Sequence, residues 1–264
     1  MADSRASYWN EVYHDYWASR VAESDQDGTS LVQSGDSKTE GDWVYEKVFE
    51  LAPFQGTTVL DVGCAWGRMF PIYHNHNLLV CGVDISHSMI ASAEKQWSSH
   101  QFVDRLNVAV AESLPFQSKS FDNLVCVAVF DATFQNKALR EFLRVLKPGG
   151  NLYITGKNSN YHLDDHLAIN AEVGARNKQH PNFFTDCKKM IDLLLSLGCN
   201  IKRSFYFPRR GDFAEFNFVE IPPEIFYEWF LVVSVPDLDE SLIRQFENFS
   251  SDYSSTFLSL QASQ

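Results

Sequence analysis

Basic residues are scarce in this sequence of 264 residues. It has 22 Lys and Arg against 34 Asp and Glu, which gives a formal net charge of −12 at pH 7. The imbalance is largest from Gly211 to Gln264, where ten acids and one base leave a charge of −9. Because an acidic chain repels a phosphate backbone, we expect no nucleic-acid partner. The simplest role of the acidic tail is to keep the protein soluble.

Cysteines and long apolar runs are also few. The five cysteines are odd in number and scattered, so neither a disulfide framework nor a zinc spacing is visible. No run approaches the ~20 apolar residues of a membrane span, so we expect no membrane association. The start, Met1 to Arg5, lacks a basic and then apolar signal segment. These features predict a cytoplasmic protein with reduced, mostly buried thiols.

The most informative segment that is present runs from Thr58 to Arg68. The apolar run from Val59 to Val62 predicts a strand that is buried on both faces. Gly63, Ala65 and Gly67 follow it, and their small or absent side chains let a ligand lie against the backbone. The helix expected after this turn presents unpaired N–H groups. The segment therefore predicts a site for an anionic or strongly polar ligand at the carboxyl edge of a parallel sheet.

The spacing of these small residues differs from that of a dinucleotide-binding loop. The dinucleotide fingerprint needs three glycines, the last of them five residues after the first, and those positions hold Gly63, Ala65 and Arg68. The third glycine lets helix and strand pack closely, which Arg68 prevents. The pattern Gly63-x-Ala65-x-Gly67 instead resembles motif I, G-x-G-x-G, of the class I S-adenosylmethionine-dependent methyltransferases. Ala65 departs from that motif by one methyl group.

Three later segments resemble the same family, in its ubiquinone/menaquinone-type small-molecule branch. Residues 80–86, VCGVDIS, resemble its second motif. Residues 111–122 contain AESLPF and then SFD, which resemble its "DAExLPF…sFD" segment, with Val110 in place of the usual Asp. Residues 143–150, LRVLKPGG, match its "vLKPGG" turn. Each motif is weak alone, but four motifs in the right order and at family-like spacing are specific.

Apolar runs alternate with helical patterns along the chain, which predicts an α/β domain with parallel strands. The resemblance implies a Rossmann-like, doubly wound sheet of seven strands whose last strand is antiparallel. Ser86 and Thr185 are the expected N-caps of two of the helices. Strands are expected at 59–62, 78–84, 106–110, 122–130 and 151–155, with a closing hairpin at 201–207 and 225–235, and helices at 43–51, 68–75, 89–97, 138–146 and 185–197.

The chain divides into three expected parts. Residues 1–42 are expected to form an N-terminal helix and loop that act as a lid. Residues 43–235 form the methyltransferase domain, in which insertions at 157–182 and 208–224 are expected to make a substrate cap. Residues 236–264 are expected to form an acidic C-terminal helix or tail, because apolar residues recur there at helical spacing.

The resemblance implies S-adenosylmethionine as cofactor and assigns residues to it. Asp84 ends the second strand, where a carboxylate can accept hydrogen bonds from both hydroxyls of a ribose. The alternative for Asp84 is a turn or helix-capping aspartate. Ala111 and Glu112 would lie against the adenine, and Tyr8 or Tyr13 of the lid would supply a hydroxyl. The assigned set is Tyr13, Asp61, Gly63, Cys64, Ala65, Gly67, Asp84, Ile85, Met89, Ala111, Glu112 and Val127.

Methyl transfer requires a nucleophile in line behind the methyl group and, for a hydroxyl acceptor, a general base. Residues 158–166 follow the fifth strand and are rich in polar groups. His162 or His166 is therefore a candidate base, with Asp131 at the end of the fourth strand as a rival. A hydrogen-bonded helix start explains the same residues, and we expect no metal there. His180 is expected to be an ordinary loop residue.

These inferences predict an S-adenosylmethionine-dependent methyltransferase that acts on an O or N atom of a small molecule, for example in secondary metabolism. Two alternatives stay open. One is methylation of a protein or peptide side chain, and the other is a non-catalytic subunit that binds S-adenosylmethionine and scaffolds a partner enzyme. The acidic tail and Ala65 keep the scaffold alternative open. A homodimer also stays open.

Overall fold

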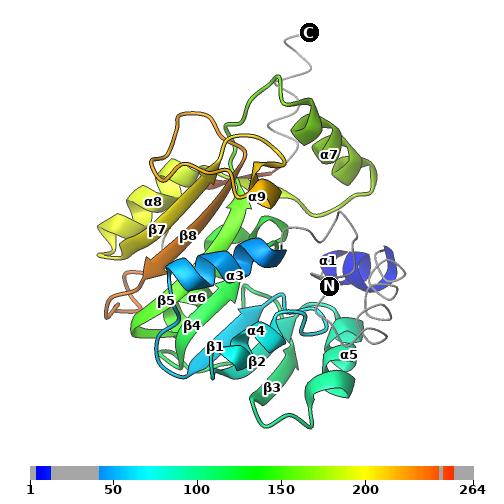
Figure 1. The fold of residues 1–264 in the computed structure, drawn as a ribbon, viewed down its shortest axis with the longest axis vertical. Coiled ribbons are helices and arrows are strands. Elements are labelled where there is room, and N and C mark those ends of the chain that lie inside the picture. Colours follow the sequence, from blue (N-terminus) through cyan, green and yellow to red (C-terminus); the bar gives the residue numbers. More distant parts are fainter. Residues whose placement is uncertain (1–3, 13–41, 244–245, 253–264) are drawn as a thin grey trace.

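A seven-stranded sheet forms the centre of the molecule, in the order β3-β2-β1-β4-β5-β8-β7 (Figure 1). The computed structural model describes residues 4–12, 42–243 and 246–252. The strands of the sheet are β1 (Thr58–Val62), β2 (Leu79–Asp84), β3 (Val103–Val108), β4 (Phe121–Cys126), β5 (Leu146–Lys157), β7 (Asn200–Phe207) and β8 (Glu228–Ser234).

The directions of the strands confirm the predicted topology. Strands β1 to β5 pair in parallel. The last strand of the sheet along the chain, β8, runs antiparallel to both of its neighbours, β5 and β7. In this register Lys157 at the end of β5 and Phe207 at the end of β7 both lie opposite Glu228. The carboxyl ends of β1 to β5 and β7 therefore meet the first residue of β8 at one edge.

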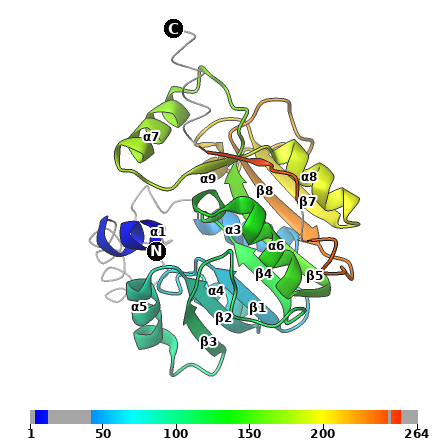
Figure 2. The ribbon, with the colours of Figure 1, turned by 180° about the vertical axis from the view of Figure 1, so that it is seen from behind.

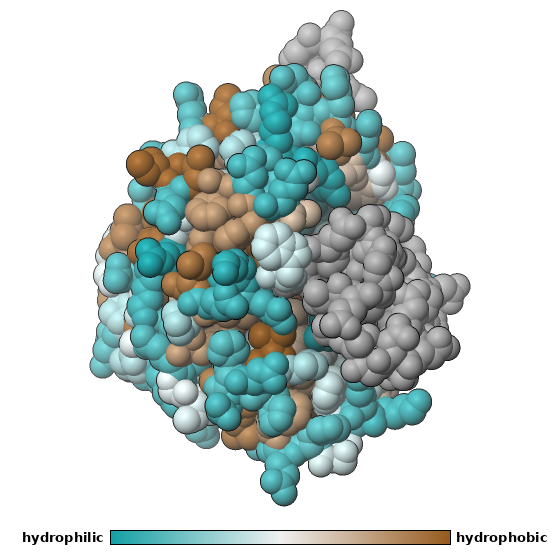
Figure 3. Space-filling model, viewed as in Figure 1, coloured by the Kyte–Doolittle hydropathy of each residue, from teal (hydrophilic) through white to brown (hydrophobic). Residues whose placement is uncertain are grey.

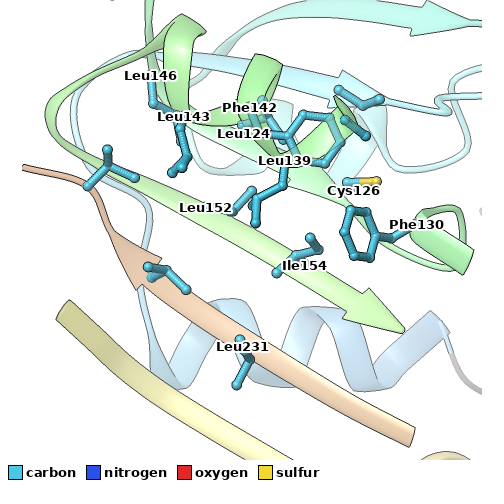
Figure 4. Close-up of a cluster of buried hydrophobic side chains, with 14 of the residues drawn as sticks. Leu124, Cys126, Phe130, Leu139, Phe142, Leu143, Leu146, Leu152, Ile154 and Leu231 are labelled. Atoms are coloured by element: carbon cyan, nitrogen blue, oxygen red, sulfur yellow. The ribbon is translucent and has the colours of Figure 1, made fainter. Parts of the chain in front are cut away.

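Helices cover both faces of the sheet (Figures 1 and 2). Side chains of α3 (Asp42–Leu51), α4 (Phe70–Asn75) and α5 (His87–Trp97) pack on one face. Those of α6 (Gln135–Val145) and α8 (Cys187–Ser196) pack on the other. Figure 4 shows the second of these layers, in which Leu139 and Phe142 of α6 lie over strand residues such as Leu152. All five cysteines are buried and free, as predicted.

Two helix starts test the predicted caps. The hydroxyl of Ser86 accepts the N–H of Met89 at 3.3 Å and caps α5, as predicted. At α8 the cap is Asp186, whose carboxylate accepts the N–H of Lys189 at 3.1 Å. The prediction of Thr185 as the cap is wrong, because the chain is still extended there and Thr185 ends β6 (Phe183–Thr185).

The segment from Pro236 does not begin as a helix. Residues 240–243 form a turn, and β9 (Ser250–Asp252) pairs antiparallel with β6. Leu238, Ile243 and Phe249 are buried against the core. The helix expected after Pro236 is therefore wrong over the described residues, since the apolar spacing there anchors an irregular chain and a short strand instead.

The remaining elements lie beyond the carboxyl edge of the sheet. Near the N-terminus, α1 (Ser4–Ser7) leads directly into a π-helical turn, Tyr8–Val12. The rest of the expected lid, including Tyr13, lies outside the described residues. The two insertions contain α7 (His166–Asn177) and α9 (Asp212–Glu215); Figure 1 shows α7 in the upper part of the molecule and α9 nearer its centre.

The surface carries both polar and apolar side chains. Figure 3 shows the two kinds intermixed on one face, and a few large apolar residues such as Leu163, Leu167 and Ile221 are exposed. Within the described part of the chain, no helix has the length and apolar character that crossing a membrane requires.

Candidate functional site

A cavity of about 180 Å³ lies at the carboxyl ends of β1, β2 and β4. Open parallel sheets bind ligands at this edge, where the strand order reverses on either side of β1. Residues from the N-terminal segment, from the turn after β1, from the loops after β2, β3 and β4, and from the loop before β6 form its walls. They are Arg5, Trp9, Val62, Gly63, Ala65, Arg68, Asp84, Ile85, Ser86, Met89, Ala109, Val110, Ala111, Glu112, Ala128, Val129, Asp131, Ala132, Thr133 and His180.

The turn after β1 has three residues in the left-handed region, Gly63 (φ 77°), Ala65 (φ 49°) and Gly67 (φ 84°). A side chain at position 63 would also come within 2.4 Å of Val129. One at position 67 would meet the indole of Trp97 at 2.6 Å, so Gly67 faces α5 rather than the cavity. Gly63 and Ala65 line the cavity, whereas Gly67 lets the turn pack closely against the helix.

Asp84 forms part of the cavity floor at the end of β2. One oxygen of its carboxylate accepts the N–H of Ala65 at 2.9 Å and the other accepts the N–H of Ser86 at 2.8 Å. Burial raises the pKa of Asp84, and these two hydrogen bonds oppose that shift. Each carboxylate oxygen can accept a further hydrogen bond, so Asp84 both fixes the turn and presents an acceptor to the cavity.

Several predicted residues lie behind the cavity wall instead of lining it. Asp61 is 3% exposed, and its Oδ2 atom has no hydrogen-bond partner in the described part of the chain. Burial raises the pKa of Asp61 to about 7, although the nearby guanidinium of Arg68 lowers it. Cys64 and Val127 are also buried, and the next residues along the chain, Ala65 and Ala128, line the cavity instead. The side chains of Asp61, Cys64 and Val127 therefore support the wall.

The N-terminal segment borders the mouth of this cavity. The guanidinium of Arg5 donates to both carboxylate oxygens of Glu112, at 2.6 and 3.1 Å. The hydroxyl of Tyr8 lies 3.0 Å from Nδ1 of His180. Trp9 joins Arg5 in the cavity lining. Glu112 thus contacts the segment expected to form the lid, rather than being left open to a ligand.

His180 lines the cavity, although the sequence predicts only a loop residue there. It lies in the loop between α7 and β6. Burial lowers the pKa of His180, while the carboxylate of Asp131 raises it. No local sequence signal marks His180, because its contacts with Tyr8 and Trp9, both distant along the chain, place it there.

A second cavity, of about 140 Å³, adjoins the first. Ala128 and Asp131 belong to the lining of both. Ala128 is held in the left-handed region (φ 56°), and its N–H donates to the hydroxyl of Thr155 at 2.7 Å. The second cavity is lined by Tyr45, Ala128, Asp131, Thr155, Gly156, Lys157, Phe213, Glu228 and Trp229.

A buried network of charges lies beside this second cavity. The ammonium of Lys157 lies 3.2 Å from Asp131 and 3.1 Å from Glu172. The Glu172 carboxylate also accepts hydrogen bonds from the Tyr227 hydroxyl and the Asn182 amide. Burial alone would lower the pKa of Lys157, but the carboxylates raise it above its usual value. Lys157 is therefore held as a cation, and Asp131 is held as its partner.

The predicted histidines lie elsewhere. Neither His162 nor His166 lines either cavity. His166 is exposed at the first residue of α7, which Asp165 caps by accepting a backbone N–H at 3.0 Å. Both carboxylate oxygens of Asp164 accept hydrogen bonds from the guanidinium of Arg209, each at 3.1 Å. The polar residues of this segment thus begin a helix and join the two insertions, and of the three candidate bases only Asp131 reaches the cavities.

The chain matches known proteins over its first five strands. Residues 60–154 match the family model described as a methyltransferase domain. The methyltransferase GfsG of Streptomyces halstedii is 29% identical over 154 residues, covering 57% of this chain and 52% of that protein. The ubiquinone biosynthesis O-methyltransferase of Coxiella burnetii is 27% identical over 119 residues, covering 45% of this chain and 51% of that protein. The chain thus spans about half the length of the curated relatives it matches.

A solved structure resembles more of the chain. The structure of the [4+2]-cyclase SpnF covers 88% of this chain and 96% of its own, with a TM-score of 0.58 and 16% identity. At that identity the likeness shows the fold alone.

Proposed function

Because residues 60–154 match the methyltransferase family model, we propose that the protein is a class I S-adenosylmethionine-dependent methyltransferase, which transfers a methyl group to an oxygen or nitrogen atom of a small molecule. One observation carries the proposal. A cavity against the turn after β1 shares Ala128 and Asp131 with a second cavity, so a donor and an acceptor can be held side by side.

The first cavity suits the cofactor of this family. Asp84 would accept hydrogen bonds from the ribose hydroxyls. Ile85, Met89 and Ala111 offer apolar surface to a flat base, and the small residues of the turn admit the chain that carries the sulfur. When bound, S-adenosylmethionine supplies a methyl group that is already activated by the positive charge on sulfur.

The N-terminal segment would then act as the lid. Arg5 and Trp9 line the first cavity, and the ion pair between Arg5 and Glu112 holds the segment there. A lid excludes water from the reacting groups and retains the cofactor. Within the expected lid of residues 1–42, this arrangement gives the role to residues 4–12, with Arg5 rather than a tyrosine hydroxyl as the main contact.

The acceptor class rests on two supports. The Coxiella burnetii relative is named a ubiquinone biosynthesis O-methyltransferase, which favours an oxygen atom of a small molecule as the acceptor. The net charge of −12 disfavours a nucleic-acid substrate.

Calorimetry with S-adenosylmethionine and S-adenosylhomocysteine tests the cofactor site. We expect Asp84→Ala to weaken the binding of both by about 1–3 kcal/mol, since the ribose hydroxyls lose their acceptor. Asp192→Ala, at an exposed position of α8, should bind as the wild type does. Unchanged affinity in the Asp84 variant would remove Asp84 from the site, and a wild type that binds neither compound would refute the proposal.

An acceptor panel then separates the proposed function from its alternatives. Transfer of labelled methyl groups to small hydroxyl or amine compounds is the expected result. Transfer only to peptides would favour methylation of protein side chains. Cofactor binding without transfer to any member of a broad panel would favour a scaffold subunit.

A further inference from the structure

Glu228 has an unusual position for a carboxylate in this protein. It is the first residue of β8, lies opposite Lys157 in the β5–β8 register, and lines the second cavity. Among the described residues, no hydrogen bond or ion pair reaches its carboxyl group. A partly buried carboxyl group that faces a cavity without a protein partner is poised to bind a ligand.

The charged groups around Glu228 are already paired. Lys157 binds Asp131 and Glu172, and the guanidinium of Arg210 donates to the Tyr227 hydroxyl at 3.0 Å. Burial raises the pKa of Glu228 to about 7; Lys157 and Arg210 lower it, and Asp131 and Glu172 raise it. Glu228 can therefore take up and release a proton near neutral pH.

The shape and walls of the second cavity limit what can bind. Tyr45 of α3, Phe213 of α9 and Trp229 of β8 supply aromatic surface. The cavity volume of about 140 Å³ is close to the ~150 Å³ of an engineered cavity that holds a benzene molecule. The cavity thus suits one flat, ring-sized group that carries a polar substituent.

We propose that the second cavity is the acceptor subsite and that Glu228 accepts the proton of a hydroxyl group on a flat, ring-sized acceptor. This inference rests on the proposed function. The hydroxyl oxygen uses a lone pair to form a bond with the methyl carbon, and the bond from sulfur to that carbon breaks with its electron pair left on sulfur. The hydroxyl proton passes to the Glu228 carboxylate and then to solvent. Asp131 also lines this cavity, but its carboxylate is already ion-paired with Lys157 at 3.2 Å.

The test uses the full chain with S-adenosylhomocysteine bound and phenol as the probe. Calorimetry between pH 5.5 and 8.5 should show that the affinity of the wild type for phenol rises through about pH 7, as Glu228 becomes an ionised acceptor. Glu228→Gln keeps the size of the side chain and an acceptor oxygen, so it should bind phenol with no such pH dependence. Its rate of methyl transfer from S-adenosylmethionine to phenol should fall 10²–10⁴-fold.

Two further variants make the test specific. Glu224→Gln makes the same charge change at an exposed position four residues earlier, and should match the wild type in binding and rate within about twofold. Phe213→Ala removes part of the aromatic wall and leaves Glu228 in place. It should weaken phenol binding about tenfold or more, from the lost apolar contact.

The outcomes separate this inference from the proposed function. S-adenosylhomocysteine binding is measured for every variant and reports correct folding of the first cavity. If the wild type does not bind that compound, the proposed function fails. If it does bind it, then absence of phenol binding, or a Glu228→Gln variant with the pH profile and rate of the wild type, overturns the role of Glu228 and of the second cavity.

Discussion

Asp61 lies in β1 and Glu228 in β8, the strands on either side of β4 and β5 in the sheet, and the two residues share one property. Burial raises the pKa of each to about 7. Asp61 is sealed behind the turn after β1, whereas Glu228 faces the second cavity. A proton on Asp61 therefore changes the folding equilibrium alone, while a proton on Glu228 is within reach of a ligand. A raised pKa marks a carboxyl group as a candidate functional group. Its access to a cavity then decides whether it can react with a ligand or only affects stability.

The same contrast separates the two cavities. The first is shaped by backbone conformation, with Gly63 and Ala65 in the left-handed region and Asp84 fixed by two backbone N–H groups. The second depends on side chains that come from distant elements, above all the pairing of Lys157 with Glu172. Substitutions should therefore damage the two cavities in different ways.

Loss of the Lys157 cation should have the largest effect and should fall on the second cavity. Lys157→Met leaves Asp131 and the fully buried Glu172 without their counter-charge, so we expect a loss of about 3–5 kcal/mol in the free energy of unfolding, measured with urea. Lys188→Met, in an exposed pair with Asp192, should leave the free energy of unfolding essentially unchanged. Similar values for both variants would mean that the second cavity does not depend on its buried ion pairs.

Asp61→Asn should show a pH-dependent effect of about 2–4 kcal/mol. The pKa of about 7 in the folded state exceeds the usual value of 3.8, so the native protein keeps a proton that the unfolded chain releases. That contribution to stability is present below about pH 4 and is lost as the pH rises through 7. The neutral variant should thus gain stability relative to the wild type between pH 4 and pH 8. A difference that stays constant across urea unfolding curves at these pH values would contradict the assignment.

A methyl group at position 63 should damage the first cavity. Gly63→Ala combines a left-handed backbone with a contact of 2.4 Å to Val129, which should cost about 2–3 kcal/mol of stability and weaken S-adenosylhomocysteine binding. Gly174→Ala is the matched control, because this helical glycine of α7 has open space beside it and should gain about 0.5–1 kcal/mol. Thermal unfolding and calorimetry measure both; equal behaviour of the two glycines would be evidence against a tightly packed turn.

The smallest effect is expected at Ala65. Ala65→Gly removes the strain of an alanine in the left-handed region, which should stabilise the folded protein by about 1–2 kcal/mol. The same change raises the entropy of the unfolded chain, which should lower the free energy of unfolding by about 0.4–1 kcal/mol. The net gain of about 0.5 kcal/mol should raise the melting temperature by about 1–2 °C and leave cofactor affinity unchanged. A lower melting temperature would show that the alanine side chain stabilises the turn.

The first cavity could be predicted from the sequence because its parts are local. The strand before Gly63, the acid that ends β2 and the cap at Ser86 are each specified by residues within a few positions of one another. The predicted positions around this cavity differ from the structure by only a few residues. β3 starts at Val103 instead of 106, and the wall after β4 begins at Ala128 instead of Val127.

The second cavity and the mouth of the first could not be predicted in this way. Glu228 and His180 gain their positions from strand pairing and loop packing between segments far apart in sequence. Arg5 meets Glu112 across more than a hundred residues. His162 and His166 belong to a segment that is rich in polar groups, as a catalytic segment can be. Its aspartates instead cap α7 and bind Arg209. Composition alone does not distinguish a catalytic segment from one that begins a helix.

The position of β8 also constrains the order in which the sheet can be completed. β8 is the last of the seven strands to be synthesised, yet it lies between β5 and β7 and provides the pairing that joins β7 to the sheet. During translation, β5 and β7 therefore present open edges until residues 228–234 have left the ribosome. Open edges of this kind are templates for aggregation. A chain that stops before residue 228 should accumulate as an insoluble product, even though every motif of the first cavity has already been made.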